Sequence, residues 1–241
     1  MMLPPAVVLC GGLGTRLRTV VSDRPKVLAE VGGVPFLTLL LRHLRGAGVA
    51  RVILSAGYRA DQIEAYVRTD APGRLTVEVV AEPEPLGTGG ALRLAAHAAG
   101  LRTPFLALNG DTFCDADLAA LVAAHKARPD ALATLALVRV PDAARYGTVA
   151  FDPDTHRVAA FAEKQPGRAA WVNAGVYVLD PAVFTGVPGG TPVSLERDIF
   201  PTLGARLFAH PQPAATFLDI GTPEDYARAA SLLPTALFDP S

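Results

Sequence analysis

The sequence has only two cysteines, no apolar run long enough to cross a membrane, and no excess of either charge. Cys10 and Cys114 stand far apart without the paired spacing of a metal site, so we expect two small buried side chains near strand ends. The longest apolar runs, such as residues 37–41, fall far short of the roughly 20 residues that span a bilayer. Paired-thiol chemistry and a membrane-spanning chain are therefore excluded.

The charge balance also excludes a large class of partners. Lysine and arginine total 22 against 23 aspartates and glutamates, so a broad basic face for nucleic acid is not indicated. We expect small-molecule substrates, and a homo-oligomer is compatible with these features. Residues 1–5 carry no positive charge and glycines soon interrupt the apolar stretch, so no signal peptide is indicated and a cytoplasmic location is expected.

Strand and helix patterns alternate over the first half of the chain. Apolar runs predict strands, and apolar residues at helical spacing predict helices between them, with Thr88 as the N-cap of one helix. The expected strands are 6–10, 51–55, 75–81 and 105–108, and the expected helices are 36–44, 60–68, one beginning near 88, and 118–125. This alternation predicts an α/β fold with a doubly wound, mostly parallel, Rossmann-like sheet.

The pattern changes after about residue 132. Shorter strand-like runs follow at 134–140, 147–151 and 176–179, broken by proline and glycine, and a helix is expected over 223–233. We interpret this half as a small added sheet region that covers one side of the binding site. With half of its residues hydrophobic, the chain can bury one large core, so residues 1–241 are expected to form a single domain.

A glycine-rich loop follows the first predicted strand. Its sequence is Gly11-Gly12-Leu13-Gly14-Thr15-Arg16, whose backbone amides can turn toward a polyphosphate while Arg16 adds a planar set of donors. Lys26 follows Pro25 in a segment expected to be extended, close enough in sequence to reach the same phosphates. The loop therefore predicts a phosphate site.

Two other phosphate loops are rejected on spacing. A Walker loop needs Gly-Lys-Ser/Thr, which the sequence lacks, and the dinucleotide fingerprint needs glycine where Leu17 stands. The proline at position 25 also interrupts the direct passage into a helix that a dinucleotide-binding unit requires. A nicotinamide-dependent dehydrogenase is therefore disfavoured, although it would share the sheet.

Two aspartates stand at the ends of apolar runs. Asp111 closes Asn109-Gly110-Asp111, which could also be a hairpin turn, but apolar residues at helical spacing follow and favour a strand-to-helix connection. Asp219 again comes after a short apolar run and before a turn. Two hard oxygen ligands, completed by triphosphate oxygens, suit Mg²⁺.

With these motifs in order, the sequence resembles the sugar-phosphate nucleotidyltransferases, which make UDP-, GDP-, CDP- and dTDP-sugars. The resemblance covers nearly the whole chain and implies a nucleotide-binding half at about 1–131 and a sugar-binding half at about 132–241. The nucleotide-binding residues that it implies are Leu9, Gly11, Gly12, Gly14, Thr15, Arg16, Lys26, Glu82, Gly87, Thr88 and Asp111.

The resemblance also implies roles for single side chains. In the segment from Glu82 to Gly90, Glu82 would address the base, and because a carboxylate only accepts hydrogen bonds while guanine offers two adjacent donors, GTP is favoured. Asp111 and Asp219 would hold the metal. The implied sugar-binding residues are Gly147, Glu163, Lys164, Asn173 and Asp219, and the implied catalytic residues are Arg16, Lys26, Asp111 and Lys164.

The implied reaction joins a nucleoside triphosphate to a sugar 1-phosphate and releases pyrophosphate. Residues 18–23, 86–92 and 217–226 look most like the branch that activates D-glycero-α-D-manno-heptose 1-phosphate with GTP, in bacterial cell-surface polysaccharide synthesis. A mannose-1-phosphate guanylyltransferase and an N-acetylmuramate 1-phosphate uridylyltransferase are the alternative enzymes. A non-catalytic nucleotide sensor on the same fold is the alternative of another class.

Overall fold

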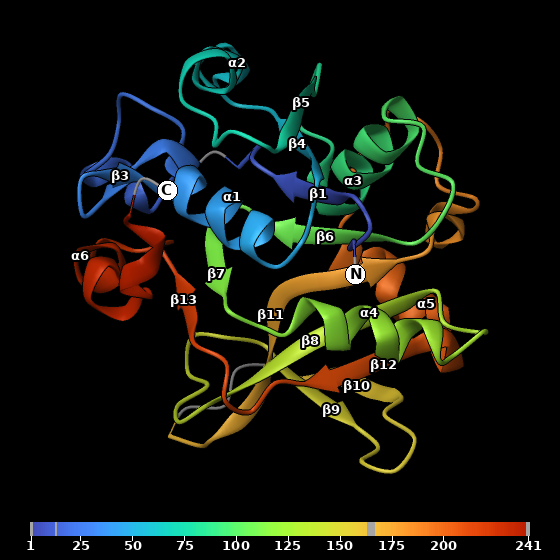
Figure 1. The fold of residues 1–241 in the computed structure, drawn as a ribbon. Coiled ribbons are helices and arrows are strands. Elements are labelled where there is room, and N and C mark those ends of the chain that lie inside the picture. Colours follow the sequence, from blue (N-terminus) through green and yellow to red (C-terminus); the bar gives the residue numbers. More distant parts are fainter. Residues whose placement is uncertain (1, 13, 163–166, 240–241) are drawn as a thin grey trace.

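A computed structural model describes residues 2–12, 14–162 and 167–239 (Figure 1). The strands of its largest sheet are β1 (Ala6–Leu9), β4 (Arg51–Ala56), β5 (Thr76–Ala81), β6 (Phe105–Asn109), β8 (Ala133–Val140), β9 (Thr148–Phe151), β10 (Val158–Ala162), β11 (Ala170–Leu179) and β12 (Leu207–Pro211). The α-helices are α1 (Phe36–Gly46), α2 (Ala60–Thr69), α3 (Gly87–Ala98), α4 (Leu118–Lys126), α5 (Phe200–Leu203) and α6 (Pro223–Leu232). Short pairs are formed by β2 (Glu30–Val31) with β3 (Val34–Pro35), and by β7 (Thr112–Cys114) with β13 (Phe217–Asp219).

The large sheet has a parallel half and an antiparallel half. Strands β5, β4, β1 and β6 are parallel neighbours in that order, as the alternation of strands and helices predicts. Beyond β6, strand β11 runs antiparallel and pairs with β8 and β9, while β12 and β10 complete the extension. The expected doubly wound fold is thus confirmed, and the added region is continuous with the central sheet, below it in Figure 1.

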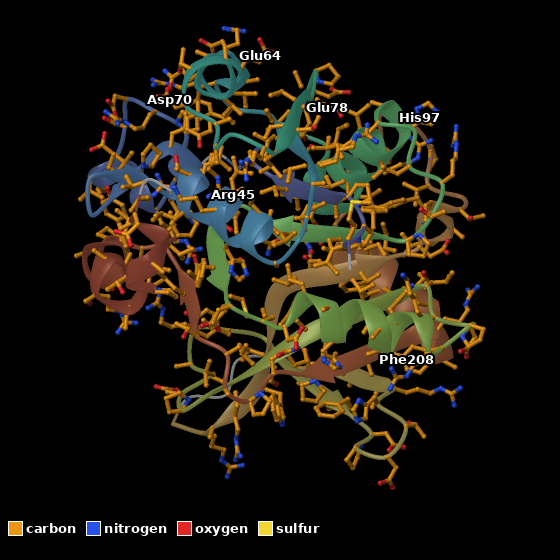
Figure 2. All side chains as sticks on the ribbon, viewed as in Figure 1. Arg45, Glu64, Asp70, Glu78, His97 and Phe208 are labelled. Carbon is orange, nitrogen blue, oxygen red and sulfur yellow. The ribbon has the colours of Figure 1, made fainter. Side chains whose placement is uncertain are left out.

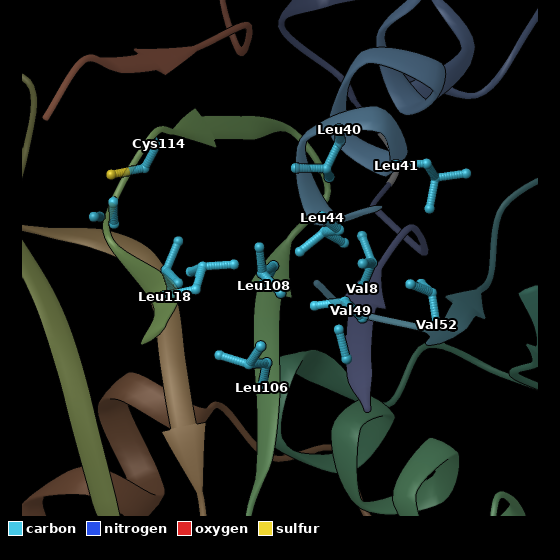
Figure 3. Packing of buried hydrophobic residues seen from close by; sticks show 14 of the residues in the cluster. Val8, Leu40, Leu41, Leu44, Val49, Val52, Leu106, Leu108, Cys114 and Leu118 are labelled. Atoms are coloured by element: carbon cyan, nitrogen blue, oxygen red, sulfur yellow. The ribbon is translucent and has the colours of Figure 1, made fainter. Parts of the chain in front are cut away.

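Helices cover both faces of the parallel strands, because successive side chains of a buried strand point to opposite faces. On β1, Val8 faces the cluster that contains α1, α2 and α4, whereas Val7 faces the cluster that contains α3 and α5. Figure 3 shows Leu40 and Leu44 of α1 packed over Val8 and its neighbours on β4 and β6. Both cysteines are buried, as expected.

A third cluster joins the far ends of the chain. The side chains of Phe36 and Leu39 on α1 pack with Phe113 of β7, Leu218 of β13 and Ala229 of α6. The antiparallel β7–β13 pair therefore fixes the carboxyl-terminal segment beside the ends of the central strands. No helix in the described residues is long and apolar enough to cross a membrane.

Three local predictions need correction. Thr88 is not the N-cap of α3, because Gly87 already begins the helix and the Thr88 hydroxyl instead accepts from the backbone of Leu195 at 2.8 Å. Lys26 is not in an extended segment; it begins a short 3₁₀ turn after Pro25. The strand that ends at Asn109 forms no hairpin, as expected. It does not connect directly to the next helix, however, because the short strand β7 lies between them.

Candidate functional site

The glycine-rich loop leaves the carboxyl end of β1, the edge at which ligands bind in open parallel sheets. Gly14 has a φ of +59°, which favours glycine, and Leu13 lies outside the described residues. A Cβ added at Gly11 would stand 2.4 Å from the Glu82 Oε1 atom, so a larger residue would displace that carboxylate. Thr15 and Arg16 are exposed at the end of the loop.

A cavity of about 430 Å³ opens between this loop and the start of α3. Volumes of roughly 300–1,000 Å³ are typical of small-molecule sites. The predicted nucleotide-binding residues that line it are Leu9, Gly11, Gly12, Glu82, Gly87 and Thr88. Gly57, Tyr58 and Ala91 also line it and were missed by the motif search, although Gly57 and Tyr58 follow the end of β4 and could have been found from that position.

Glu82 stands directly after β5, with its carboxylate at the cavity wall. Its Oε2 atom accepts from the backbone nitrogen of Leu86 at 3.2 Å, and its Oε1 atom accepts from the Ser55 hydroxyl at 3.4 Å. Burial raises the pKa of the Glu82 carboxyl, and these two hydrogen bonds only partly oppose that effect. Since a carboxylate has about four acceptor sites, two remain for a ligand.

A second cavity, of about 200 Å³, continues from the first. Leu9, Gly12 and Thr88 line both cavities, and the second is also lined by Lys26 and Asp111. The two cavities therefore form one cleft, running from Glu82 past the glycine loop to the end of β6. Val27 and Asn109 line the second cavity too, and neither was among the predicted site residues.

Three charged side chains meet at the end of this cleft. The Lys26 Nζ atom lies 2.9 Å from the Asp111 Oδ2 atom and 3.7 Å from the Asp219 Oδ1 atom. Burial, and after it the negative charge of Asp111, raise the pKa of the Asp219 carboxyl, while Lys26 opposes both effects. One ammonium thus partly compensates two carboxylates, so the cluster can accept further positive charge.

The fold explains why residues so distant in sequence meet here. Antiparallel pairing of β7 with β13 places Asp219 opposite Thr112, beside Asp111, and the backbone nitrogen of Ile220 donates to the Asp111 carbonyl at 3.1 Å. A Cβ added at Gly110 would stand 2.4 Å from the Leu9 carbonyl oxygen, so glycine is required for the turn to cross the end of β1.

Asn173, one of the predicted sugar-binding residues, lies on β11 in the antiparallel half. The register of β11 shifts between Asn173 and Tyr177, and within this bulge Gly175 comes so near that an added Cβ would stand 2.7 Å from the Asn109 Nδ2 atom. Asn173 uses its side chain to shape the bulge, accepting from the Gly175 nitrogen and donating to the Tyr177 hydroxyl.

Of the remaining sugar-binding predictions, the structure describes Gly147. Gly147 is exposed just before β9, and the preceding Tyr146 ring packs edge-on against Phe217 of β13 at 5.3 Å between ring centres. Glu163 and Lys164 lie outside the described residues. Elsewhere, Figure 2 shows acidic and basic side chains interspersed over the molecule, among them Arg45 on α1 and Glu64 on α2.

The glycine-rich loop, the cavity beside it and the charge cluster lie at one end of a doubly wound sheet, which defines an α/β protein with a ligand-sized cleft at the carboxyl ends of its parallel strands. The family model described as nucleotidyl transferase matches residues 5–235, and the chain belongs to this family.

Its relatives include guanylyltransferases of two kinds. The chain is 37% identical to the D-glycero-alpha-D-manno-heptose 1-phosphate guanylyltransferase of Aneurinibacillus thermoaerophilus, covering 93% of this chain and 96% of that protein. It is 40% identical to the mannose-1-phosphate guanylyltransferase of Mycobacterium tuberculosis, covering 94% of this chain but only 63% of that longer protein. Among solved structures, HddC from Yersinia pseudotuberculosis complexed with GMP-PN has a TM-score of 0.84 at 36% identity, covering 95% of this chain and 99% of HddC.

The raised pKa of Asp219 makes a prediction about stability. A carboxyl whose folded-state pKa is raised destabilises the folded state at every pH above that value, and the penalty vanishes below the unfolded-state pKa. Asp219→Asn should therefore raise the free energy of unfolding at pH 7.5, and the gain should shrink toward zero near pH 3. Urea denaturation at both pH values measures this, with the exposed Asp154→Asn as the control. A loss of stability at pH 7.5, or a gain that is independent of pH, would contradict the charge argument.

Proposed function

We propose that this chain transfers GMP from GTP to a sugar 1-phosphate, giving a GDP-sugar and pyrophosphate, with manno-heptose 1-phosphate as the favoured acceptor. The observation that carries this proposal is the continuous cleft, with a base-sized cavity at one end and the cluster of Lys26, Asp111 and Asp219 at the other. A triphosphate extended along the glycine loop would connect the two ends.

The chemistry is an in-line displacement at the α-phosphorus of GTP. A phosphate oxygen of the sugar 1-phosphate forms the new bond to the α-phosphorus, and the bond to the oxygen that bridges to the β-phosphorus breaks, so that pyrophosphate leaves with that electron pair. The attacking oxygen is already anionic and needs no general base. Catalysis then consists of positioning and charge neutralisation.

The position of each side chain indicates which substrate group it would bind or neutralise. Arg16 and Lys26, with the amides of Gly11, Gly12 and the following loop, would hold the triphosphate and neutralise charge on the leaving pyrophosphate. Lys164 would bind the phosphate of the incoming sugar, with Glu163, Gly147 and Asn173 toward the sugar hydroxyls. The Asn109 side-chain oxygen is buried and accepts no hydrogen bond from the described residues, so it is a further acceptor for a substrate hydroxyl.

Asp111 and Asp219 would hold Mg²⁺. Both are hard oxygen donors, and the pair shares the single ammonium of Lys26, which lies 2.9 Å from Asp111 and 3.7 Å from Asp219. No cluster of three or more His, Cys, Asp or Glu side chains suited to a metal occurs in the described part of the chain, so phosphate oxygens and water would complete the ligand set. When bound, the ion would neutralise phosphate charge.

Glu82 supports guanine as the base. Its carboxylate keeps two acceptor sites after the bonds from Leu86 and Ser55, and the adjacent N1–H and N2–H donors of guanine match them. Uracil presents an acceptor beside its N3–H and would oppose a carboxylate there. The solved HddC complex, whose ligand is GMP-PN, and the guanylyltransferase relatives support the same choice.

The acceptor sugar is the finer part of the proposal. Manno-heptose 1-phosphate is favoured by the resemblance of residues 18–23, 86–92 and 217–226 to that branch and by the heptose relative of Aneurinibacillus at 37% identity. Mannose 1-phosphate is the second candidate, because the mannose-1-phosphate guanylyltransferase of Mycobacterium tuberculosis has the higher identity, at 40%.

Two buried free cysteines fit a reducing, cytoplasmic setting for the reaction.

The deciding experiment measures pyrophosphate release with Mg²⁺ and each of GTP, UTP, CTP, dTTP and ATP against a panel of sugar 1-phosphates. The panel contains manno-heptose, mannose, glucose and N-acetylmuramate 1-phosphates. We expect the highest kcat/KM for GTP with manno-heptose 1-phosphate. A preference for UTP with N-acetylmuramate 1-phosphate would select the uridylyltransferase, and no turnover with any pair would favour a nucleotide sensor.

The assignment of Glu82 makes a separate prediction. Glu82→Gln should raise the Kd for GTP about 10- to 100-fold, because hydrogen bonds to a charged group contribute roughly 1.5–3 kcal/mol. In the unaltered protein, GTP affinity should fall as the pH drops through the raised pKa of Glu82, since only the ionised carboxyl accepts both guanine donors. Calorimetric titration with GTP from pH 8 to pH 5 measures both effects.

Glu64→Gln, which changes an exposed carboxylate on α2, is the matched control and should leave GTP binding unchanged. Equal GTP affinity in Glu82→Gln and the unaltered protein would remove Glu82 from base recognition.

A further inference from the structure

The cavity of about 430 Å³, here called the base cavity, is lined by the first turn of α3, and that turn packs against a segment much later in the sequence. Residues 191–196, here called the strap, lie against the glycine-rich first turn of α3. The Val193 carbonyl accepts from the nitrogens of Gly89 and Gly90 at 2.8 and 3.2 Å, and the Val193 nitrogen donates to the Leu86 carbonyl at 2.8 Å. The first turn of α3 is thus held by backbone hydrogen bonds to the strap.

The glycines of that turn permit this close packing. A Cβ added at Gly87 would stand 2.7 Å from the Val193 carbonyl oxygen, and one at Gly90 would stand 2.8 Å from the Thr191 carbonyl oxygen. These contacts are to backbone, which cannot move aside as a flexible side chain can. The position of Gly87 and Thr88, which line the base cavity, therefore depends on where the strap lies.

Glu196, at the end of the strap, receives hydrogen bonds from three hydroxyls. Thr88 donates to its Oε2 atom at 2.8 Å, Ser194 donates to the same oxygen at 3.2 Å, and Tyr177 donates to its Oε1 atom at 3.1 Å. Within the part of the chain that the structure describes, no lysine or arginine forms an ion pair with Glu196. Among the described residues, the side-chain donors to its carboxylate are these three hydroxyls.

The directions of two of these bonds are fixed by their other partners. The Thr88 hydroxyl accepts from the Leu195 nitrogen at 2.8 Å, so its own proton is directed to Glu196. The Tyr177 hydroxyl accepts from the Asn173 Nδ2 atom at 2.8 Å, so its proton is directed there too. One carboxylate thus connects the base-cavity wall on α3 with the bulge of β11, which contacts the turn that carries Asp111.

We infer that Glu196 is a positioning residue that couples the two substrate sites, so that a change at the sugar-side bulge alters nucleotide binding through Tyr177, Glu196 and Thr88. This inference rests on the proposed function for the identity of the two substrates. It predicts that removing the Tyr177 hydroxyl weakens GTP binding, although Tyr177 does not line the base cavity. It also predicts that this effect disappears once Glu196 is gone.

The test uses Tyr177→Phe, Glu196→Gln, Glu196→Ala and the double variant Tyr177→Phe with Glu196→Ala. For each we would measure KM and kcat for GTP and for the acceptor, GTP affinity by calorimetry, and amide hydrogen exchange at Gly89 and Gly90. We expect Glu196→Ala to raise both KM values at least about 10-fold, the scale of losing one hydrogen bond to a charged group. Tyr177→Phe should raise the KM for GTP about 3-fold alone and not at all in the Glu196→Ala background.

Glu196→Gln keeps the shape and one acceptor oxygen, so it should retain more GTP affinity than Glu196→Ala. Asp198→Asn is the control, because Asp198 accepts from the Ser194 nitrogen of the strap and, among the described residues, bonds neither Thr88 nor Tyr177. It weakens the strap without removing the connection, so Tyr177→Phe should still raise the KM for GTP about 3-fold in the Asp198→Asn background.

The outcomes separate the inference from the proposed function. If the unaltered protein turns over GTP but Tyr177→Phe changes the KM for GTP equally with and without Glu196, the coupling is refuted and the proposed function stands. If Glu196→Ala lowers thermal stability while both KM values and the exchange at Gly89 and Gly90 stay unchanged, Glu196 is merely structural. If the unaltered protein has no guanylyltransferase activity but Tyr177→Phe alters GTP affinity as predicted, the proposed function fails and the coupling survives.

Discussion

The ammonium of Lys26 lies between the carboxylates of Asp111 and Asp219, and the rest of the site is arranged around this contact. Each partner comes from a different part of the chain: a 3₁₀ turn after Pro25, the turn after β6, and the end of β13. The short β7–β13 pair, packed under α1 and α6, holds the last of them in place. Burial, and after it the negative charge of Asp111, raise the pKa of Asp219. Two carboxylates here share one ammonium, and in the proposed function this imbalance favours a divalent cation and a phosphate-rich substrate.

Glycine allows the backbone to approach closely wherever the cleft needs it. Gly11 makes room for Glu82, Gly110 lets the aspartate turn cross β1, and the glycines that open α3 accept the strap of residues 191–196. As a result the base cavity, the glycine-rich loop and the charge cluster lie along one cleft at the carboxyl ends of the parallel strands. The strap adds a second connection between the two halves of the cleft, through the three hydroxyls that bind Glu196.

Local sequence predicted the parallel strands, the helices between them and the loop after β1, because each is encoded by a contiguous apolar pattern. It could not predict β7 and β13, since three-residue strands acquire their pairing only from partners about a hundred residues away. Thr88 was mistaken for a helix cap for a related reason: its hydroxyl bonds Leu195 and Glu196, which no local pattern reveals. Glu82, Lys26, Asp111 and Asp219 were found through motif resemblance. The structure places the first three in the walls of the cleft and Asp219 beside Lys26, and their chemical roles stay predictions. Glu196 was missed because nothing near it in sequence signals a site.

The measurement that tests the central claim most directly is metal binding at the cluster. Mn²⁺, which prefers the same oxygen ligands as Mg²⁺, can be titrated by electron paramagnetic resonance into the protein with a non-hydrolysable GTP analogue. The account predicts one tight site in the unaltered protein and at least about tenfold weaker binding in Asp111→Asn, the scale of losing one charged contact. Equal Mn²⁺ affinity in both proteins, with the analogue bound, would contradict the claim that this charge cluster is the seat of the reaction.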